Sequence, residues 1–334
     1  MPTSIINHQK LNIILILVLI ILSFFSLFIG TVAFSPSDVF LALIGQADDT
    51  TTIIINELRL PRVLLGALAG ATLGLSGASL QGMLRNPLAD PGIIGVSASA
   101  GLGAVMAIYF GLSEIFPAAI QLMAIAGALV ATFILVIVAA RESSVLTLIL
   151  AGIGISSLAT AAISLVMNFA PNPMTLQDMV MWMLGSLENR TSADISLSLP
   201  FIIIGWVLHI GISHGLDASS LGDDAARSLG IDTKKMQLKI ILGGAISVGA
   251  VVAVCGTIGF VGLIVPHIIR RIIGYRPSQL LIPSALMGAI LLISADLLTR
   301  IPMGHGQLRL GVVTAIIGAP AFLYIIYKTR RAMR

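Results

Sequence analysis

The sequence predicts an all-α integral membrane protein with about ten transmembrane helices, built as one transmembrane domain over residues 1–334. The first observation is composition: 57% of residues are hydrophobic, 10% are charged, and the mean hydropathy is +1.04. Soluble globular domains do not reach these values. The second observation is a series of long charge-free windows, and the third is the uneven placement of the basic residues.

The charge-free windows mark the expected membrane spans, because about 20 apolar residues suffice to cross a bilayer. There are nine: 11–37, 63–84, 91–113, 115–140, 143–177, 195–216, 240–269, 277–295 and 310–327. The first has a longer apolar core than a cleavable signal peptide, so we expect a retained first membrane helix.

The window 240–269 is long for one helix and contains Gly256, Gly259 and Pro266, residues that break or bend helices. If it crosses once, the basic residues divide almost evenly between the two sides. If it turns back near Gly256–Gly259, fourteen of the 19 basic residues become cytoplasmic. The positive-inside rule therefore predicts ten spans with both termini in the cytoplasm. The piece Ile258–Ile272 is too short to cross fully and is expected to begin part-way into the membrane.

The window 63–84 has small residues at every fourth position: Gly66, Gly70, Gly74, Ala78 and Gly82. Such ridges let helix backbones approach closely in lipid. The pattern predicts a helix inside the bundle, and by itself it is also what any tightly packed membrane helix would show.

Two polar loops stand out. The segment 171–194 is predicted to lie outside the cytoplasm and to carry a short helix, with Thr175 as N-cap and Met179, Trp182 and Met183 on one face. These side chains either pack internally or form an adaptable surface for a solute.

The second loop, 215–235, is cytoplasmic in this topology. Asp223 and Asp224 can cap a helix that stops at Gly230, and Asp232 or Thr233 can begin the next span. The loop is either an ordinary connection or a docking surface for a cytoplasmic partner.

The motifs of several enzyme classes are missing. There is no GxxxxGK[ST] sequence, so the chain has no P-loop for ATP. The five histidines lack metal-ligand spacing, and the single cysteine, Cys255, implies neither a disulfide nor a metal cluster. Residues 211–215 match GxSxG formally, but at the end of a membrane helix, where a nucleophile elbow does not form.

Energy for transport is expected to come from outside the chain. Acidic residues are absent from the span centres, which argues against an ion-coupled secondary transporter. We therefore expect a transport subunit, not an enzyme, that binds no cofactor or metal of its own and no nucleic acid. A separate ATPase partner would use the ATP and Mg²⁺.

Several motifs in order resemble the permease subunits of bacterial type II ABC importers, the FecCD/BtuC-like family of iron-siderophore, haem and vitamin B12 uptake permeases. They cover nearly the whole chain: Arg59-Leu60-Pro61-Arg62, Asn86 to Pro91 (NPLADP), Gly95-Val96-Ser97, Leu221 to Gly230 (LGDDAARSLG), Gly259 to Arg270 (GFVGLIVPHIIR), Ser294-Ala295-Asp296 and Gly311 to Pro320 (GVVTAIIGAP).

The resemblance implies a permease in the bacterial cytoplasmic membrane, paired with a second permease subunit, most simply as a homodimer. It also implies two ATPase subunits on the cytoplasmic side and a periplasmic or lipid-anchored solute-binding protein outside. Ferric siderophore is the expected solute, with haem or cobalamin as alternatives within the family. A stand-alone secondary transporter is the alternative from another class.

The resemblance also assigns residue roles. It implies docking of the binding protein at exposed Arg59, Arg62 and Arg300. The solute path would be lined by residues 144–167 and 175–185, with a cytoplasmic gate at Ser144, Val145 and Leu146. The ATPase-coupling residues would be Leu221, Gly222, Asp223, Asp224, Ala226, Arg227, Leu229 and Gly230.

The chain departs from the family pattern at several positions. Ser99 replaces a common glycine, Tyr275-Arg276-Pro277 replaces a frequent Asp-His-Arg, and Gln307 and Arg309 replace Glu and Pro. The last two changes affect the expected docking surface and leave the expected fold unchanged.

Overall fold

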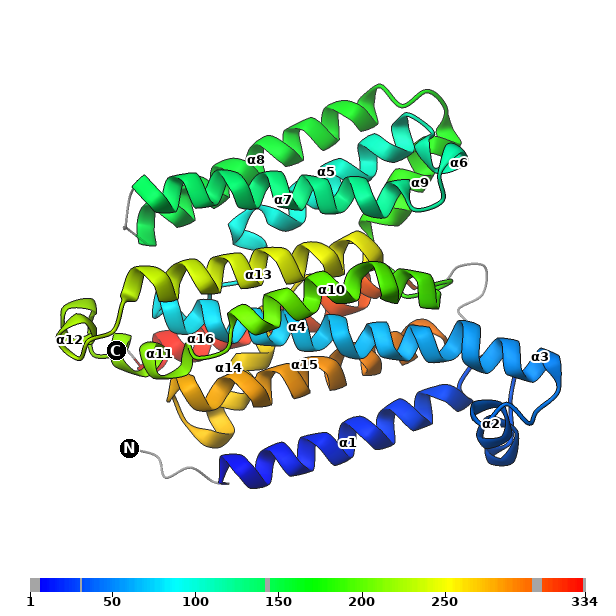
Figure 1. Ribbon diagram of the computed structural model, residues 1–334, viewed down its shortest axis with the longest axis horizontal. Coiled ribbons are helices and arrows are strands. Elements are labelled where there is room, and N and C mark those ends of the chain that lie inside the picture. Colours follow the sequence, from blue (N-terminus) through cyan, green and yellow to red (C-terminus); the bar gives the residue numbers. More distant parts are fainter. Residues whose placement is uncertain (1–6, 31, 142–144, 302–307, 333–334) are drawn as a thin grey trace.

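The computed structural model describes residues 7–30, 32–141, 145–301 and 308–332. Every regular element in these ranges is helical (Figure 1). The elements are α1 (His8–Phe28), α2 (Pro36–Leu43), α3 (Asp49–Thr52), η1 (Ile53–Arg59), α4 (Leu60–Leu84), η2 (Pro91–Ile94), α5 (Val96–Tyr109), α6 (Leu112–Ile115), α7 (Ala119–Arg141), α8 (Val145–Asn168), α9 (Pro173–Met183), α10 (Ser192–Leu208), α11 (Ser213–Ser219), α12 (Asp223–Ser228), α13 (Thr233–Cys255), α14 (Val261–Ile273), α15 (Pro277–Thr299) and α16 (Leu310–Ala332).

The main helices of the described residues follow the expected spans. Six helical stretches are long and apolar enough to cross a membrane: α1, the continuous run Asp49–Leu84 that ends in α4, and α7, α8, α13 and α15. α10 and α11 pass the same test together as a pair bent by 51°. α5 and α16 contain further apolar stretches, and together with α14, which ends in two arginines, they bring the described helices to the expected ten. The predicted fold class is confirmed.

The long window 240–269 divides where predicted. α13 ends at Cys255, and Gly256 turns the chain with φ +71°. A Cβ on Gly256 would lie 2.4 Å from the Trp182 carbonyl oxygen, so the turn needs glycine for both its conformation and its space. α14 then has 13 residues. At about 1.5 Å per residue it is shorter than the hydrocarbon core of a bilayer, as expected.

α4 lies inside the bundle and packs against α15, α14 and α13. Its small residues face these neighbours at very short range. A Cβ added to Gly70 would lie 2.2 Å from the carbonyl oxygen of Gly288, and one on Gly74 would lie 2.1 Å from that of Ser284, both in α15. A Cβ on Gly77 would meet the carbonyl oxygen of Gly262 in α14 at 2.0 Å. The ridge therefore sets the distance between α4 and two other helices.

Gly70→Ala is expected to lower the thermal midpoint of the purified protein, because the new methyl group would collide with the backbone of Gly288. Gly154→Ala in α8 is the matched control. Its Cβ would meet nothing within 4 Å, so the helix propensity of alanine should leave stability unchanged or slightly raised. Equal midpoints for the two variants would show that the α4–α15 contact is not as close as described.

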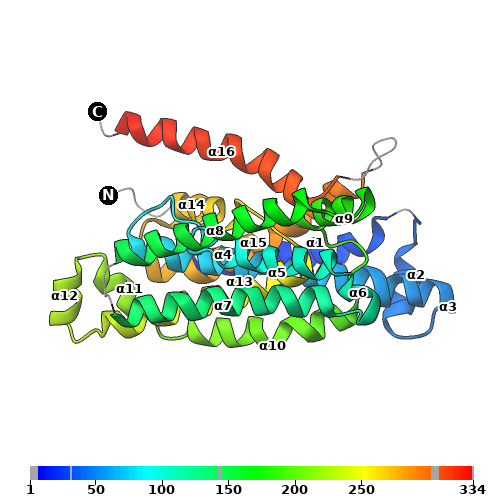
Figure 2. The same cartoon turned by 90° about the horizontal axis from the view of Figure 1, so that it is seen from above.

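The two ends of the molecule differ. The beginning of α1 and the end of α16 lie at the same end as α11 and α12, and α2, α3, α6 and α9 lie at the other (Figures 1 and 2). This arrangement fits an even number of crossings.

α16 stands away from the main bundle in Figure 2. α8 is also peripheral, since 17% of its apolar window is buried against 78% for α13. These helices present apolar surface to lipid or to another subunit.

Candidate functional site

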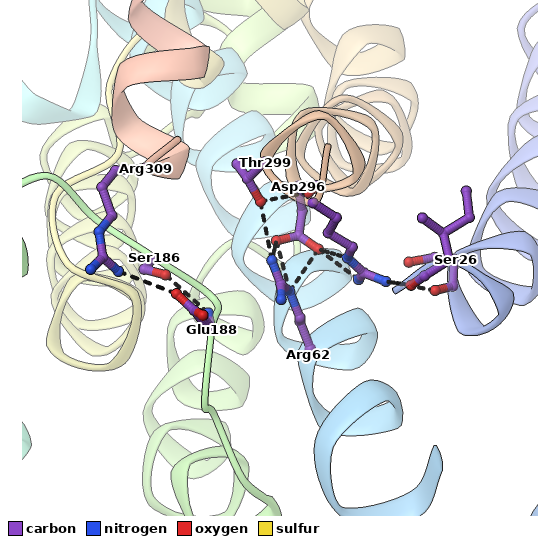
Figure 3. A network of polar contacts seen from close by, with 9 residues as sticks. Ser26, Arg62, Ser186, Glu188, Asp296, Thr299 and Arg309 are labelled. Atoms are coloured by element: carbon purple, nitrogen blue, oxygen red, sulfur yellow. Dashed lines mark hydrogen bonds and ion pairs between the residues drawn. The ribbon is translucent and has the colours of Figure 1, made fainter. Parts of the chain in front are cut away.

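Two arginines and one aspartate form a polar network at the end of the molecule opposite α12, and Figure 3 labels Arg62 and Asp296 within it. Asp296, near the end of α15, accepts hydrogen bonds from both arginines. The Nη2 atom of Arg62 lies 2.8 Å from Oδ1 of Asp296, and Nη2 of Arg300 lies 2.7 Å from Oδ2. Arg62 also donates to Oγ1 of Thr299 at 3.1 Å. One carboxylate is thus shared by two guanidinium groups.

Arg59 and Arg300 hold the end of α1. Arg59 donates from Nη1 to the carbonyl oxygen of Leu27 at 2.6 Å, and from Nη2 to that of Val32. Arg300 donates from Nη1 to the carbonyl oxygens of Ser26 at 2.7 Å and Ile29 at 2.8 Å. These carbonyls lie at a helix C-terminus, where they lack partners within the helix and favour a positive charge.

The expectation that the docking arginines are all exposed is wrong for two of them. Arg59 is 7% exposed, and the side chain of Arg300 is 5% exposed. The side chain of Arg62 keeps 20% exposure. The physical reason is that the carbonyls ending α1 and the carboxylate of Asp296 bind the guanidinium groups internally. Sequence reasoning gave Asp296 no role, although its position four residues before Arg300 suggests an ion pair on one helix face.

The polar loop 215–235 contains most of α11, all of α12 and the first residues of α13. Asp223 and Asp224 occupy the first turn of α12, and the N-cap residue is Gly222, so the expected side-chain cap is wrong. Gly230 follows the helix with φ +78°, and Asp232 caps α13 by accepting from the Lys235 amide at 3.0 Å.

The remaining candidate coupling residues lie on and around α12. Leu221 and Leu229 are exposed at either side of it, whereas Ala226 is fully buried beneath it. Arg227 forms an exposed pair with Asp224 on the same helix, with 3.7 Å between Nη1 and Oδ1. α12 therefore presents an exposed surface of charged residues flanked by leucines.

Both short helices are bound to the membrane helices by ion pairs. Asp217 of α11 accepts from Nε of Arg276 at 2.8 Å and from the amide and hydroxyl of Ser278 at 2.9 and 2.7 Å. Asp223 of α12 pairs with Arg85, the residue that ends α4. α11 and α12 are therefore linked to two turns of the transmembrane domain, one before α15 and one after α4.

The short helix of the 171–194 segment is α9. Its N-cap is Asn172, whose Oδ1 accepts from the Thr175 amide at 2.8 Å. Thr175 as N-cap is therefore wrong, because Pro173 already occupies the first turn of the helix. Met179 is fully buried, while Met174 is exposed. The side chain of Met179 thus packs inside the protein, whereas Met174 leaves part of the methionine-rich surface exposed.

Two cavities lie beside the end of α9. The first, about 220 Å³, is polar and is lined by Met181, Trp182, Ser186, Glu188, Asn189, Arg190 and Arg309. The second, about 490 Å³, is mostly apolar and is lined by Met183, Leu184, Thr257, Gly259, Phe260, Gly311, Val312, Ala315 and Ile316. Backbone hydrogen bonds from Leu310 to Gly185 (3.1 Å) and from Gly311 to Leu184 (3.0 Å) hold the beginning of α16 against α9.

Arg309 lies in the polar cavity, where its Nη1 is 3.5 Å from Oε2 of Glu188 (Figure 3). Glu188 is oriented by a hydrogen bond from its own amide to Oγ of Ser186 at 3.0 Å. The departure from the family pattern at Arg309 is thus matched by an acidic partner. Gln307 lies outside the described residues.

The candidate gate lies at the beginning of α8. Ser144 falls outside the described residues, and Val145 is the first residue of α8. The side chain of Leu146 is exposed. Within the described ranges, no group of three or more His, Cys, Asp or Glu side chains could hold a metal ion.

Exposed short helices at one end, an arginine network at the other and cavities beside broken helices define a multi-pass permease. The profile of the FecCD transport family matches residues 17–328. The Fe(3+)-citrate import system permease protein YfmE of Bacillus subtilis is 38% identical over 315 residues, 94% of this chain and 93% of that protein. The vitamin B12 import system permease protein BtuC of Vibrio cholerae is 40% identical over 278 residues, 82% and 83% of the two chains.

A solved structure agrees with these relatives. It shows a transporter described as of the metal-chelate ABC type in an inward-facing conformation. It is 31% identical, has a TM-score of 0.84, and matches 96% of this chain and 99% of the other. The chain belongs to the FecCD transport family, as its motifs predict. It is accordingly a multi-pass membrane transport subunit of an ABC importer, and separate ATPase subunits hydrolyse the ATP.

Proposed function

We propose that this chain is the permease of an ATP-driven importer that carries a ferric siderophore or similar iron chelate across the bacterial cytoplasmic membrane. Support comes from the whole-length similarity to an Fe(3+)-citrate permease and to a metal-chelate transporter structure. A cobalamin permease is the second candidate, because the vitamin B12 permease of Vibrio cholerae is slightly more identical over a shorter region. Family membership removes the stand-alone secondary transporter from consideration.

The assembly we propose contains two copies of this chain, two ATPase subunits and one solute-binding protein. The exposed apolar faces of α8 and α16 support pairing of two permease chains. The ATPase would bind the surface of α11 and α12, and the beginning of α1 and the end of α16 would then lie on the cytoplasmic side. The ATPase alone would hold ATP and Mg²⁺.

The solute path would run along α8 and α9, past the two cavities, toward a gate formed by Ser144, Val145 and Leu146. The broken backbone between α13 and α14 borders the apolar cavity. Irregular backbone at membrane depth occurs in proteins where it lines a cavity, which supports this placement.

The three candidate docking arginines differ in burial, so we propose different roles for them in the docking of the binding protein. Arg62 is the one of the three with appreciable exposure, and it would pair with a carboxylate of the binding protein. Arg59 and Arg300 would act indirectly, by holding the end of α1 and orienting Asp296.

Reconstitution in liposomes tests the proposed function. The permease, purified with its ATPase and supplied with its binding protein, is expected to take up ⁵⁵Fe-labelled ferric siderophore only when ATP is inside. In the same preparation, Arg62→Gln should weaken binding-protein affinity about tenfold or more, the effect of losing a charged hydrogen bond. Asp296 remains paired with Arg300 in this variant, so the fold should persist.

Three outcomes would contradict parts of this proposal. ATP-driven uptake of cyanocobalamin without uptake of any ferric chelate would assign the chain to cobalamin. Uptake by the permease alone, driven by an ion gradient, would contradict the importer itself. Unchanged affinity in Arg62→Gln would limit the arginine network to structural support.

A further inference from the structure

The segment 85–95 between α4 and α5, which we term the linking turn, contacts three parts of the molecule that the proposed mechanism must move together. It begins with Arg85 in the left-handed conformation, φ +49°. Asn86 then forms an Asx turn by accepting from the Leu88 amide at 2.9 Å. Asp90 accepts from the Gly92 amide at 2.7 Å and starts the single turn η2. These local bonds make the segment a defined structure with little freedom to absorb a displacement.

Its first contact is with the coupling surface. A hydrogen-bonded ion pair joins Nη2 of Arg85 to Oδ1 of Asp223 in the first turn of α12. Both side chains are partly exposed, at 43% and 37%. Exposed pairs of this kind contribute little to stability, so the ion pair is dispensable for folding.

The second contact is with α14, through the buried side chain of Gln81 near the end of α4. The two hydrogens of its Nε2 are shared among three carbonyl oxygens, that of Ala89 in the linking turn at 3.2 Å and those of Gly262 and Leu263 in α14 at 3.3 and 3.1 Å. Its Oε1 accepts from Nη2 of Arg270 at 3.0 Å. One amide therefore ties the turn to both halves of α14.

The third contact is with α8, the helix that begins at the candidate gate. η2 packs against α8. Gly95, with φ +85°, approaches so closely that a Cβ there would lie 2.8 Å from the Gly152 carbonyl oxygen and 2.9 Å from Ile155. Nearer the beginning of α8, Leu148 and Ile149 line a small cavity together with Asp90.

We propose that the linking turn transmits the displacement of α12 to α8, with the Arg85–Asp223 ion pair as its input and the contact of Gly95 with Gly152 as its output. This proposal rests on the proposed function, in which the ATPase binds α11 and α12. α8 otherwise packs against α5 and α7. Arg85 is thus a positioning residue that links ATP hydrolysis to the gate.

The experiment is a charge-reversal cycle in the reconstituted importer, with transport and ATP hydrolysis measured separately. Arg85→Glu and Asp223→Arg are made singly and together, and Lys239→Glu on the exposed side of α13 serves as the charge-reversal control. In each single variant, the number of solute molecules transported per ATP hydrolysed is expected to fall about fivefold or more. A fivefold change is at the lower end of the effects typical of coupling between two sites. The double variant re-forms the pair with its charges exchanged and should regain most of the loss.

Other outcomes overturn the proposal, and they can be separated from a failure of the proposed function. If single variants transport as efficiently as the wild type, or if the double variant stays as poor as the single ones, the pair does not carry the coupling. If Asp223→Arg abolishes ATPase binding while Arg85→Glu has no effect, Asp223 is a docking residue alone. A wild-type complex without ATP-driven transport would contradict the proposed function itself, and with it the role of the linking turn.

Discussion

Asp296→Ala is expected to destabilise the protein by about 3–5 kcal/mol, the typical effect of removing one partner from a buried ion pair. The carboxylate neutralises Arg62 and Arg300 at 2.8 and 2.7 Å, and its side chain is 3% exposed. Without it, Arg62 and Arg300 lose the carboxylate that they share, and the guanidinium group of Arg300 is left buried beside a second positive charge. Arg300, which loses its carboxylate partner in this variant, also holds the end of α1. The first helix should therefore loosen from the bundle.

The measurement is the thermal midpoint and the yield of monodisperse protein in detergent. Glu57→Ala is the matched control, since it removes an exposed carboxylate from the adjoining η1 helix. Asp296→Asn should fall between the two, because it keeps hydrogen-bond acceptance and loses the charge. An Asp296→Ala protein as stable as the control would mean that the arginines do not depend on this carboxylate.

Gln81→Met is expected to have the second largest effect. Methionine matches the length of glutamine, so packing is nearly kept while the hydrogen bonds that the amide donates and accepts are lost. The guanidinium of Arg270 then loses its buried acceptor, and three backbone carbonyls lose a donor. An unsatisfied buried polar group costs about 1–3 kcal/mol, and more when it is charged.

Gln81→Glu separates the two parts of this effect, because it keeps an acceptor for Arg270 and removes the donor to α14 and the linking turn. We expect its thermal midpoint to lie above that of Gln81→Met and below that of the wild type. Identical midpoints for Gln81→Met and the wild type would contradict the description of Gln81 as the side chain that joins α4, the linking turn and α14.

Sequence patterns predicted those features that depend on local chemistry. The spans could be found because each crosses a medium that excludes charge, so their limits are visible as charge-free windows. The division of 240–269 could be found because glycines interrupt it and because the basic residues require a turn there. The small-residue ridge of α4 predicted close approach, although its partners, α15 and α14, could not be named from the pattern.

The polar contacts could not be predicted in the same way. Arg62 and Asp296 are 234 positions apart, and Gln81 and Arg270 are 189 positions apart. No periodicity connects residues so distant, and each alone resembles an ordinary group at a helix end. The same limitation explains why Arg59 was expected to be exposed: an arginine before an apolar helix reaches water unless another helix places carbonyl oxygens beside it.

The sequence by itself determined the class of this protein, its spans and the family to which it belongs, because hydropathy, charge placement and short motifs act over one helix or one turn. The tertiary structure alone decided which charged groups are buried and which are presented. It turned Arg59 and Arg300 inward, left Arg62 partly exposed, and placed Arg85 against Asp223. The physical reason is that the energy of a buried charge depends on partners brought close by folding, which no local stretch of sequence contains.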